Sequence, residues 1–548
     1  SVGPVRPIPC STPKPGADSS ARWSAGLALF GAAWLLAVQP AWSQAPVRLG
    51  APIPGVEAAR VEAVAPWPSL LPGGSPSWQP LLVQTEGAGE DGGGDDLLDE
   101  FSDGGGDDLL DEFGDGGGDD LLDEFGGEGP GAARSPGNGE PFWPAWFDLG
   151  GSIALGGAYN YQQEAPTPQR GLSRLRTTLR LELELDFPAS WEAQASGIAF
   201  YDAAYELKGR SEFTPEVLDR YEDEVEFREL FVRGSPLSFL DVKVGRQVVV
   251  WGFADFIRVV DILNPLENRE PGLADIEDLR LPIAMTRIDF FLGPLSLMGV
   301  AVHEIEFNKD PVVGSDFFPF DGPPPPERIP SDTGANTETG FELKGIFSGW
   351  DLAFYYAEFF DDSAHTELVV RDGVPQPRLR HSRLTMRGAA VNVALGTWLL
   401  KSEAALFDGL EFFSAQGEPF KPKERWDAMV GLDYNGINDT TITVEAVNRR
   451  IHDFEPNLDE TGEELKQYAL SYRGDFLNQT LTLNGILLLF GNAADEGGVQ
   501  RYSVEYDVFD AFSVTGGVLI FQSAGDGNPL FQRVRLNDRV FFDIKYSF

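Results

Sequence analysis

Cysteine, histidine and basic residues are scarce in this chain of 548 residues. It has one cysteine, Cys10, and four histidines, which do not have the spacing of a zinc motif. Arginine and lysine number 42 against 86 acidic residues, giving a formal charge of −44. Because a surface that binds phosphates needs a basic excess, nucleic acid is excluded as a partner. No Gly-x-Ser-x-Gly motif occurs, and we expect neither an enzyme nor a bound cofactor or metal.

Long hydrophobic runs are also missing. The longest apolar stretch, residues 25–38, is shorter than the roughly 20 residues that a membrane-spanning helix needs. Together with Arg22 and the small residues of Ser43-Gln44-Ala45, it predicts a secretory signal peptide within a leader of residues 1–45. The alternative is a membrane anchor, which the short stretch disfavours. Removal of the leader would take Cys10 with it and leave no thiol.

The segment that follows, residues 46–142, is rich in Pro, Gly, Ala and acidic residues and shows no sustained periodicity. This composition predicts a disordered arm, which we expect in the periplasm. The sequence Gly-Gly-Gly-Asp-Asp-Leu-Leu-Asp-Glu-Phe occurs three times in it, at residues 92–101, 104–113 and 116–125. Between residues 86 and 128 there are 18 acidic residues and no basic one.

These repeats admit three interpretations. In the first interpretation, each copy forms one helical turn with its leucines and phenylalanine on the same side. The three tethered copies would then bind a groove of a periplasmic protein multivalently. Calcium binding is disfavoured because calcium-binding β-roll repeats use a shorter, nine-residue period. The third interpretation is a solvated acidic linker. The candidate docking residues are Leu97, Leu98, Phe101, Leu109, Leu110, Phe113, Leu121, Leu122 and Phe125.

From residue 143 to residue 548, segments of about ten residues alternate apolar and polar side chains. In residues 172–187 the odd positions from Leu175 are mostly leucine, whereas most even positions are charged. A period of two places these sets on opposite faces of a strand. The same alternation occurs in residues 341–347, 426–434, 468–472, 481–489 and 534–548.

Short turns and long polar loops alternate between these segments. We expect eight short turns and nine long loops, hence about 18 strands with both chain ends on the short-turn side. The count falls to 16 if residues 225–233 and 378–395 pair differently. The predicted fold is all-β: a transmembrane antiparallel up-and-down β-barrel preceded by the disordered acidic arm. A soluble secreted β-protein is the alternative.

Aromatic residues support the membrane interpretation. Tryptophans lie near predicted strand ends, as in the interfacial girdles of outer-membrane barrels. The last residues resemble the terminal strand that the barrel-insertion machinery recognises, with apolar side chains at Phe542, Ile544, Tyr546 and Phe548. We therefore expect an outer-membrane location, with membrane lipid and the insertion machinery as partners.

Several charged residues are predicted to line the lumen. Arg174, Arg176 and Arg180 share the polar face of one strand, and Arg535 and Arg539 share that of the last strand. If the first and last strands pair, these residues form an arginine-rich stripe near the outer mouth that attracts anions or orients dipolar solutes. The alternative is a solvated wall that balances the acidic loops.

Residues 251–280 form the most unusual of the long loops. Their first half is too apolar for an external loop, so we expect it to be buried in the lumen as a constriction. The alternative is a lid over the mouth. The candidate constriction residues are Trp251, Asp255, Arg258, Asp261 and Arg269.

The run Gly245-Arg-Gln-Val-x-x-Trp-Gly, followed by Asp261-x-x-Asn-Pro265 and Arg280-Leu-Pro282, resembles a poorly characterised family of porin-like outer-membrane barrels. The resemblance covers roughly residues 143–548. It implies a transport function, and it implies that the protein works together with RND-type inner-membrane exporters of hydrophobic or lipid-like molecules.

The sequence thus predicts an outer-membrane channel for small or amphipathic solutes, with a charged lumen narrowed by a loop. The alternative is an exit or docking component of a lipid or hydrophobe export system, which recruits a periplasmic protein or an RND-type transporter through the acidic repeats. Whether the purified barrel conducts ions alone separates the two. The oligomeric state stays open.

Overall fold

The computed structural model describes residue 144 and residues 146–166, 168–273, 279–318, 322–371, 374–412, 422–455, 462–523 and 529–548. Eighteen of its strands form one sheet. They are β1 (Phe147–Asn160), β2 (Gly171–Phe187), β3 (Trp191–Asp202), β4 (Asp223–Leu237), β5 (Leu240–Gln247), β6 (Ile283–Leu292), β7 (Leu295–Val302), β9 (Glu338–Phe347), β10 (Trp350–Phe360), β13 (Arg383–Leu395), β14 (Trp398–Leu410), β15 (Lys423–Ile437), β16 (Thr440–Ile451), β17 (Glu464–Phe476), β18 (Leu481–Phe490), β19 (Gly497–Phe509), β20 (Phe512–Ser523) and β21 (Arg539–Ser547).

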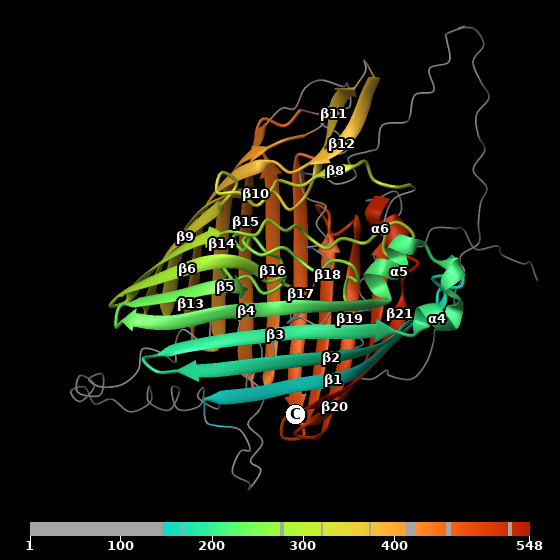
Figure 1. Ribbon diagram of the computed structural model, residues 1–548, viewed down its shortest axis with the longest axis horizontal. Coiled ribbons are helices and arrows are strands. Elements are labelled where there is room, and N and C mark those ends of the chain that lie inside the picture. Colours follow the sequence, from blue (N-terminus) through green and yellow to red (C-terminus); the bar gives the residue numbers. More distant parts are fainter. Residues whose placement is uncertain are drawn as a thin grey trace, which may run out of the picture. The chain divides into compact units, whose positions relative to one another are not determined.

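The sheet closes on itself. Each strand pairs antiparallel with the next one along the chain, and β21 pairs with β1, so Tyr546 lies opposite Ile153 and Arg539 opposite Asn160 (Figure 1). Closure leaves no free sheet edge. The predicted antiparallel up-and-down barrel of 18 strands is confirmed, and 16 strands are excluded because residues 225–233 lie in β4 and residues 383–395 form β13.

Turns and loops alternate as predicted. Short turns such as Gly293-Pro294 and Gly396-Thr397 connect strands at one end, here called the short-turn end. Long connections lie at the other, the loop end. They hold the small sheet of β8 (Glu327–Arg328), β11 (His365–Arg371) and β12 (Val374–Arg380) and the helices α4 (Ala204–Lys208), η3 (Arg210–Glu212), α5 (Pro215–Tyr221) and α6 (Pro529–Val534). None of the helices in the described ranges is long and apolar enough to cross a membrane.

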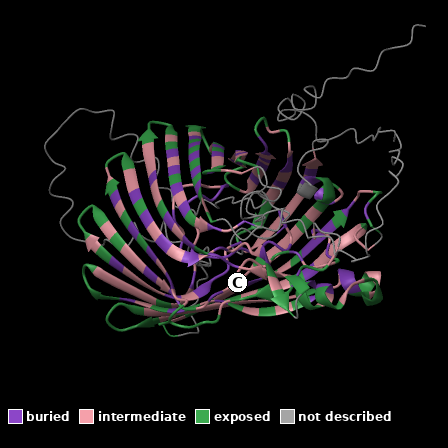
Figure 2. Cartoon of the chain, turned by 90° about the horizontal axis from the view of Figure 1, so that it is seen from above, coloured by how far each residue is buried: buried purple, intermediate pink, exposed green. Residues whose placement is uncertain are grey.

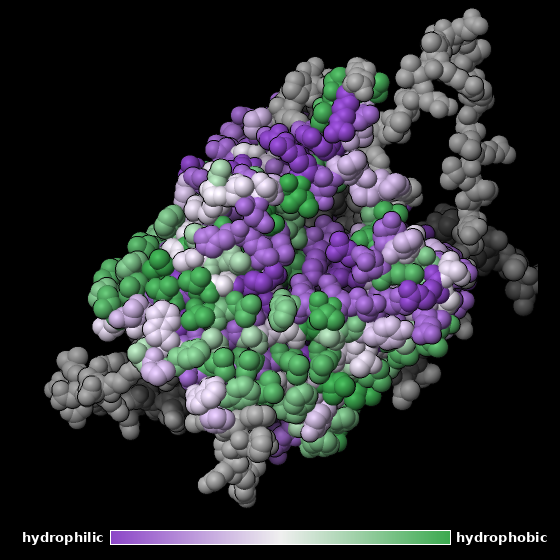
Figure 3. Space-filling view, viewed as in Figure 1, coloured by the Kyte–Doolittle hydropathy of each residue, from purple (hydrophilic) through white to green (hydrophobic). Residues whose placement is uncertain are grey.

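Apolar side chains cover the outer face of the barrel. Leu181 on β2, Phe354 on β10 and Val430 on β15 are 43%, 51% and 56% exposed. Many other large apolar side chains, at every second position of the strands, are also exposed. Figure 2 shows buried and exposed positions alternating along the strands, and Figure 3 shows hydrophobic residues gathered over the strand surface and hydrophilic ones over the loops. Such a surface suits hydrocarbon rather than water, which is what a transmembrane barrel requires.

The last strand is shorter than predicted. Residues 534–548 were expected to be one strand, but β21 begins at Arg539, and the chain before it forms α6. The reason is that Phe531 and Val534 of α6 are buried in the interior core rather than placed on an outer face. Phe542, Tyr546 and Phe548 do face outward, at 42%, 45% and 52% exposure. The recognition of these residues by the insertion machinery stays a prediction.

Candidate functional site

The connection between β5 and β6 folds into the barrel over its described residues, 248–273 and 279–282. Its Gly252 N–H donates to the hydroxyl of Tyr355 on β10 at 3.2 Å. Further along, its backbone reaches Glu403 near the middle of β14 and Glu445 near the middle of β16. Seven strands separate β5 from β16 on one side and nine on the other. The loop therefore crosses the interior at mid-height rather than covering the mouth.

Glu403 and Glu445, here called the latch carboxylates, hold the tip of this loop. Glu403 accepts hydrogen bonds from the backbone N–H groups of Phe253, Ala254 (2.8 Å) and Val260 (3.3 Å). Glu445 accepts from those of Asp255 (2.6 Å), Phe256 (3.1 Å) and Ile257 (3.1 Å). A buried backbone hydrogen bond of this kind contributes roughly 0.5–1.5 kcal/mol. Six such bonds fix the loop tip to the far wall.

Ion pairs strengthen the same contact. Lys401 on β14 lies 2.6 Å from Asp255 of the loop and 2.6 Å from Asp433 on β15. Arg449 on β16 donates to the backbone oxygen of Arg258 at 2.7 Å. Asp255, predicted to be a pore-facing charge, is thus bound to the wall.

Asp261 is the charged centre of the loop. It lies 3.0 Å from Arg258 and 2.9 Å from Arg280, and it accepts a hydrogen bond from the N–H of Trp251 at 3.2 Å. Burial would raise the pKa of Asp261, but Arg258 and Arg280 outweigh it and hold the pKa below its usual value. The side chains of Arg258 and Asp261 are only 7% and 5% exposed. Both were expected to face an open pore, but they pair inside the folded loop instead.

The motif residues tie the base of the loop together. Asn264 donates to the backbone oxygens of Gln247 (3.1 Å) and Leu281 (2.9 Å), and it accepts from the N–H of Val249 (2.8 Å). The Gly-Arg-Gln-Val, Asp-x-x-Asn and Arg-Leu-Pro runs therefore meet in space. Sequence reasoning used them as a family signature and missed this structural role.

The apolar part of the loop packs against an apolar wall. Trp251 is buried, with its ring centroid 5.2 Å from that of Tyr355, so it is neither a girdle residue nor exposed to a pore. Gly340 permits this packing, because a Cβ there would lie 2.6 Å from the indole. The wall residues buried with the loop include Met285, Val302, Phe359, Met386, Phe407, Met429, Val447 and Leu519. The inner wall that meets the loop is therefore mixed, because some of these apolar side chains lie on the same strands as Lys401, Glu403 and Glu445.

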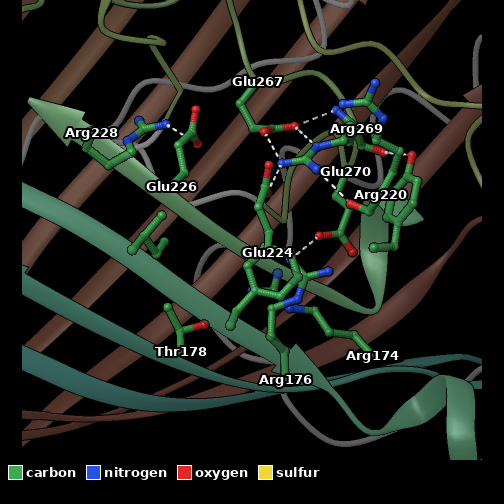
Figure 4. A pocket seen from close by; sticks show the side chains of 13 residues that line it. Arg174, Arg176, Thr178, Arg220, Glu224, Glu226, Arg228, Glu267, Arg269 and Glu270 are labelled. Atoms are coloured by element: carbon green, nitrogen blue, oxygen red, sulfur yellow. Dashed lines mark hydrogen bonds and ion pairs between the residues drawn. The ribbon is translucent and has the colours of Figure 1, made fainter. Parts of the chain in front are cut away.

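The charged lining lies on the opposite side, where β2, β3, β4 and α5 face residues 267–270 of the loop. They line an open cavity, in which about 70 Å³ is available to the centres of water-sized molecules. Figure 4 shows Arg174 and Arg176 rising from β2 toward Glu270 and Glu224. Arg269 reaches Glu267 at 2.6 Å and Glu224 at 2.7 Å.

Arg176 and Glu270 join the barrel wall to the loop. Their atoms Nη1 and Oε2 lie 2.6 Å apart. Burial would raise the pKa of Glu270, but Arg176 and Arg174 outweigh it and lower the pKa to about 2. Glu270 is therefore ionised at every physiological pH, and the pair persists.

The predicted arginine stripe is only partly assembled. Arg174 and Arg176 line the cavity, and Arg180 lies half-buried further along the same face of β2. Arg539 is 2% exposed, stacked over Phe317 at 4.5 Å. Arg535 contradicts the prediction: it follows α6, outside β21, and its side chain is exposed.

Asp316 gives the loop end a pH dependence. It belongs to the connection between β7 and β9 and lies 3.5 Å from Arg539. Burial raises its pKa from 3.8 to about 6, more than Arg539 and Lys208 lower it. Because the pKa of Asp316 is raised in the folded state, its contribution to loop packing is fully present below about pH 4 and is lost as the pH rises through about 6.

We expect residues 312–318 to exchange amide hydrogens more slowly at pH 5 than at pH 8, after correction for intrinsic rates, and Asp316→Asn to remove the difference. An undiminished difference in that variant would contradict this assignment.

The acidic repeats and their docking residues, from Leu97 to Phe125, lie outside the described residues, as does the leader with Cys10. Within the described ranges, no group of three or more His, Cys, Asp or Glu side chains is arranged to hold a metal ion.

A family model described as "Protein of unknown function (DUF1302)" matches residues 156–548. The chain belongs to this family. The match spans nearly the whole barrel of this DUF1302 protein, including the loop motifs, and confirms the predicted resemblance to a poorly characterised barrel family. The association with RND-type exporters stays a prediction.

Solved structures resemble the DUF1302 barrel distantly. OccAB1 of Acinetobacter baumannii is 13% identical, with a TM-score of 0.44, over 76% of this chain and 99% of its own. OccK8 (OprE) of Pseudomonas aeruginosa is 11% identical, with a TM-score of 0.43, over 73% and 97%. A BenF-like porin from Pseudomonas fluorescens is 12% identical, with a TM-score of 0.42, over 74% and 97%. At these scores the likenesses carry no argument about function. No curated protein matches the chain.

Proposed function

We propose that this chain is an outer-membrane channel through which solutes pass between the inward-folded loop and the wall formed by β2, β3 and β4. The observation that carries the proposal is the path of the described loop residues, 248–273 and 279–282, across the interior. They are fixed to β14 and β16 on one side and border the charged cavity on the other. The apolar outer face supports a membrane location with lipid as the partner.

The proposed solute path follows from which part of the barrel interior the loop occupies. On the side of β10, β13 and β14, apolar side chains of the wall pack closely against the loop, and the polar groups of the loop tip pair with Glu403 and Lys401. On the side of β2 to β4, Arg174, Glu224 and Glu226 line an open space with charged groups that hold water. Solutes would therefore cross the barrel on this charged side, and the loop would set the width of the solute path.

Filling the cavity tests this path. Thr178 on β2 lines the cavity, whereas its neighbour Leu179 faces outward at 37% exposure. We expect Thr178→Trp to reduce the single-channel conductance of the full chain in a planar bilayer by half or more, because the indole obstructs the cavity. Leu179→Trp, which adds the same bulk on the lipid side, is expected to leave conductance unchanged. Equal conductance of both variants and the wild type would rule out this cavity as the path.

A further inference from the structure

Three adjacent strands give the floor of the cavity three parallel strips of different chemistry. In the sheet register, Thr178 of β2 lies opposite Phe200 of β3, which lies opposite Glu224 of β4. Ile198 of β3 likewise lies opposite Glu226. The β2 strip, with Arg174 and Arg176, is basic and the β3 strip is apolar. The β4 strip carries Glu224 and Glu226, followed by Arg228. All these residues border the cavity (Figure 4).

The basic strip has hydrogen-bond donors to spare. Arg176 is held in place by Glu270 at 2.6 Å, by Asp202 at 3.4 Å and by the ring of Phe200 at 4.2 Å. Its Nη2 atom, however, is buried and has no hydrogen-bond partner in the described part of the chain, and the same holds for Nε of Arg174. A buried donor without a partner costs about 1–3 kcal/mol, so this strip favours a guest with acceptor oxygens.

The acidic strip has acceptors to spare. Glu224 lies 3.1 Å from Lys309 and 2.7 Å from Arg269, and Glu226 lies 2.9 Å from Lys309 and 3.7 Å from Arg228. The two glutamate side chains remain 21% and 18% exposed. An ionised carboxylate offers about four acceptor sites, more than these contacts use. This side of the cavity therefore accepts an additional cationic donor.

The spacing of the strips sets the distance between the two charges of a guest. Neighbouring strands lie about 4.8 Å apart, so the β2 and β4 backbones are about 10 Å apart. Ile198 and Phe200 lie between them and offer an apolar contact. A guest with one charge would satisfy one strip only and would face like charge at the other.

We propose that the cavity binds small zwitterions in which an apolar segment separates a carboxylate from an ammonium group. The carboxylate lies on Arg174 and Arg176, the apolar segment on Ile198 and Phe200, and the ammonium on Glu224 and Glu226. The proposal rests on the proposed function, because it names the solute class for the same cavity.

The test is calorimetric titration of the detergent-purified full chain with ε-aminocaproate, caproate, n-hexylammonium and glycine. We expect ε-aminocaproate to bind at least tenfold more tightly than the two singly charged probes, and more tightly than glycine, whose charges are too close together. Arg174→Gln and Glu226→Gln should each weaken its binding about tenfold. The matched control is Arg473→Gln, which removes an arginine from β17, away from the cavity, and should leave binding unchanged.

The outcomes separate this proposal from the channel proposal. Equal affinity for caproate and ε-aminocaproate would mean a simple anion site, and no heat from any probe would mean that the cavity is only an ion-pair network. Either result would overturn the zwitterion assignment. Tight ε-aminocaproate binding combined with unchanged conductance of Thr178→Trp would keep the site and reject the channel path.

Discussion

Replacing Glu403 and Glu445 together with glutamine is expected to release the loop tip and to raise single-channel conductance several-fold. Each carboxylate accepts three backbone N–H groups, from residues 253–260. A glutamine amide has one acceptor oxygen and places an NH₂ group where a backbone N–H also points. Each buried N–H group that is left without an acceptor costs about 1–3 kcal/mol. The loop tip therefore loses several kcal/mol of attachment.

Two measurements check this result. Conductance in a planar bilayer should rise and become noisier, and amide exchange of residues 253–260 should accelerate at least tenfold. Glu505→Gln is the matched control, because Glu505 lies on β19 opposite Thr515, away from the loop tip. A double variant with the conductance and exchange rates of the wild type would show that the latch carboxylates do not hold the loop.

Asp261→Ala is expected to lower the free energy of unfolding by about 3–5 kcal/mol, the typical cost of removing one member of a buried ion pair. Asp261 is 4% exposed and neutralises both Arg258 and Arg280. Without it, two guanidinium groups stay in a buried environment with no carboxylate between them. The N–H of Trp251 also loses its acceptor.

Urea unfolding of the refolded chain, followed by tryptophan fluorescence, measures this effect. Asp475→Ala serves as the control, because the Arg473–Asp475 pair is 27% and 20% exposed and should contribute less than about 1 kcal/mol. Asp261→Asn keeps an acceptor for the Trp251 N–H, so its loss of unfolding free energy should lie between those of Asp261→Ala and Asp475→Ala. Equal destabilisation by Asp261→Ala and Asp475→Ala would contradict the buried centre described for the loop.

The sequence was sufficient to predict the barrel, because strand periodicity reports directly on which side chains share a face. Residues 172–187 alternate leucine and charge, and in β2 they do place Leu181 outside and Arg176 inside. The inward fold of residues 248–273 was also predictable, since so apolar a loop must be buried. Nothing in these local patterns, however, says what covers the inner face.

The anchoring of the loop depends on contacts that the sequence does not display. Glu403 and Glu445 were not singled out, because a carboxylate at an inner position resembles a solvated lumen wall. A usable signal existed: each precedes an apolar inner position, Ala405 or Val447, and an acid in such surroundings indicates a buried partner. Which partner it has depends on barrel closure, since the residues that meet are 143 or more positions apart.

The charges of the loop were identified but placed wrongly for the same reason. Arg258 and Asp261 were expected to face a pore, yet three residues apart on a tight loop they pair with each other. Arg535 was assigned to the last strand because alternation continues backward from β21. The burial of Phe531 and Val534 against the interior core folds that segment as α6 instead.

The central claim, that residues 248–282 narrow a channel, is tested most directly by single-channel conductance of the full chain with residues 251–280 replaced by a short Gly-Ser linker. The matched control shortens the connection between β10 and β13, which carries β11 and β12 at the loop end. We predict stable openings in the wild type, a several-fold larger conductance after replacement of 251–280, and little change in the control. Equal conductance of the wild type and the loop replacement, or no conductance in either, would contradict the account.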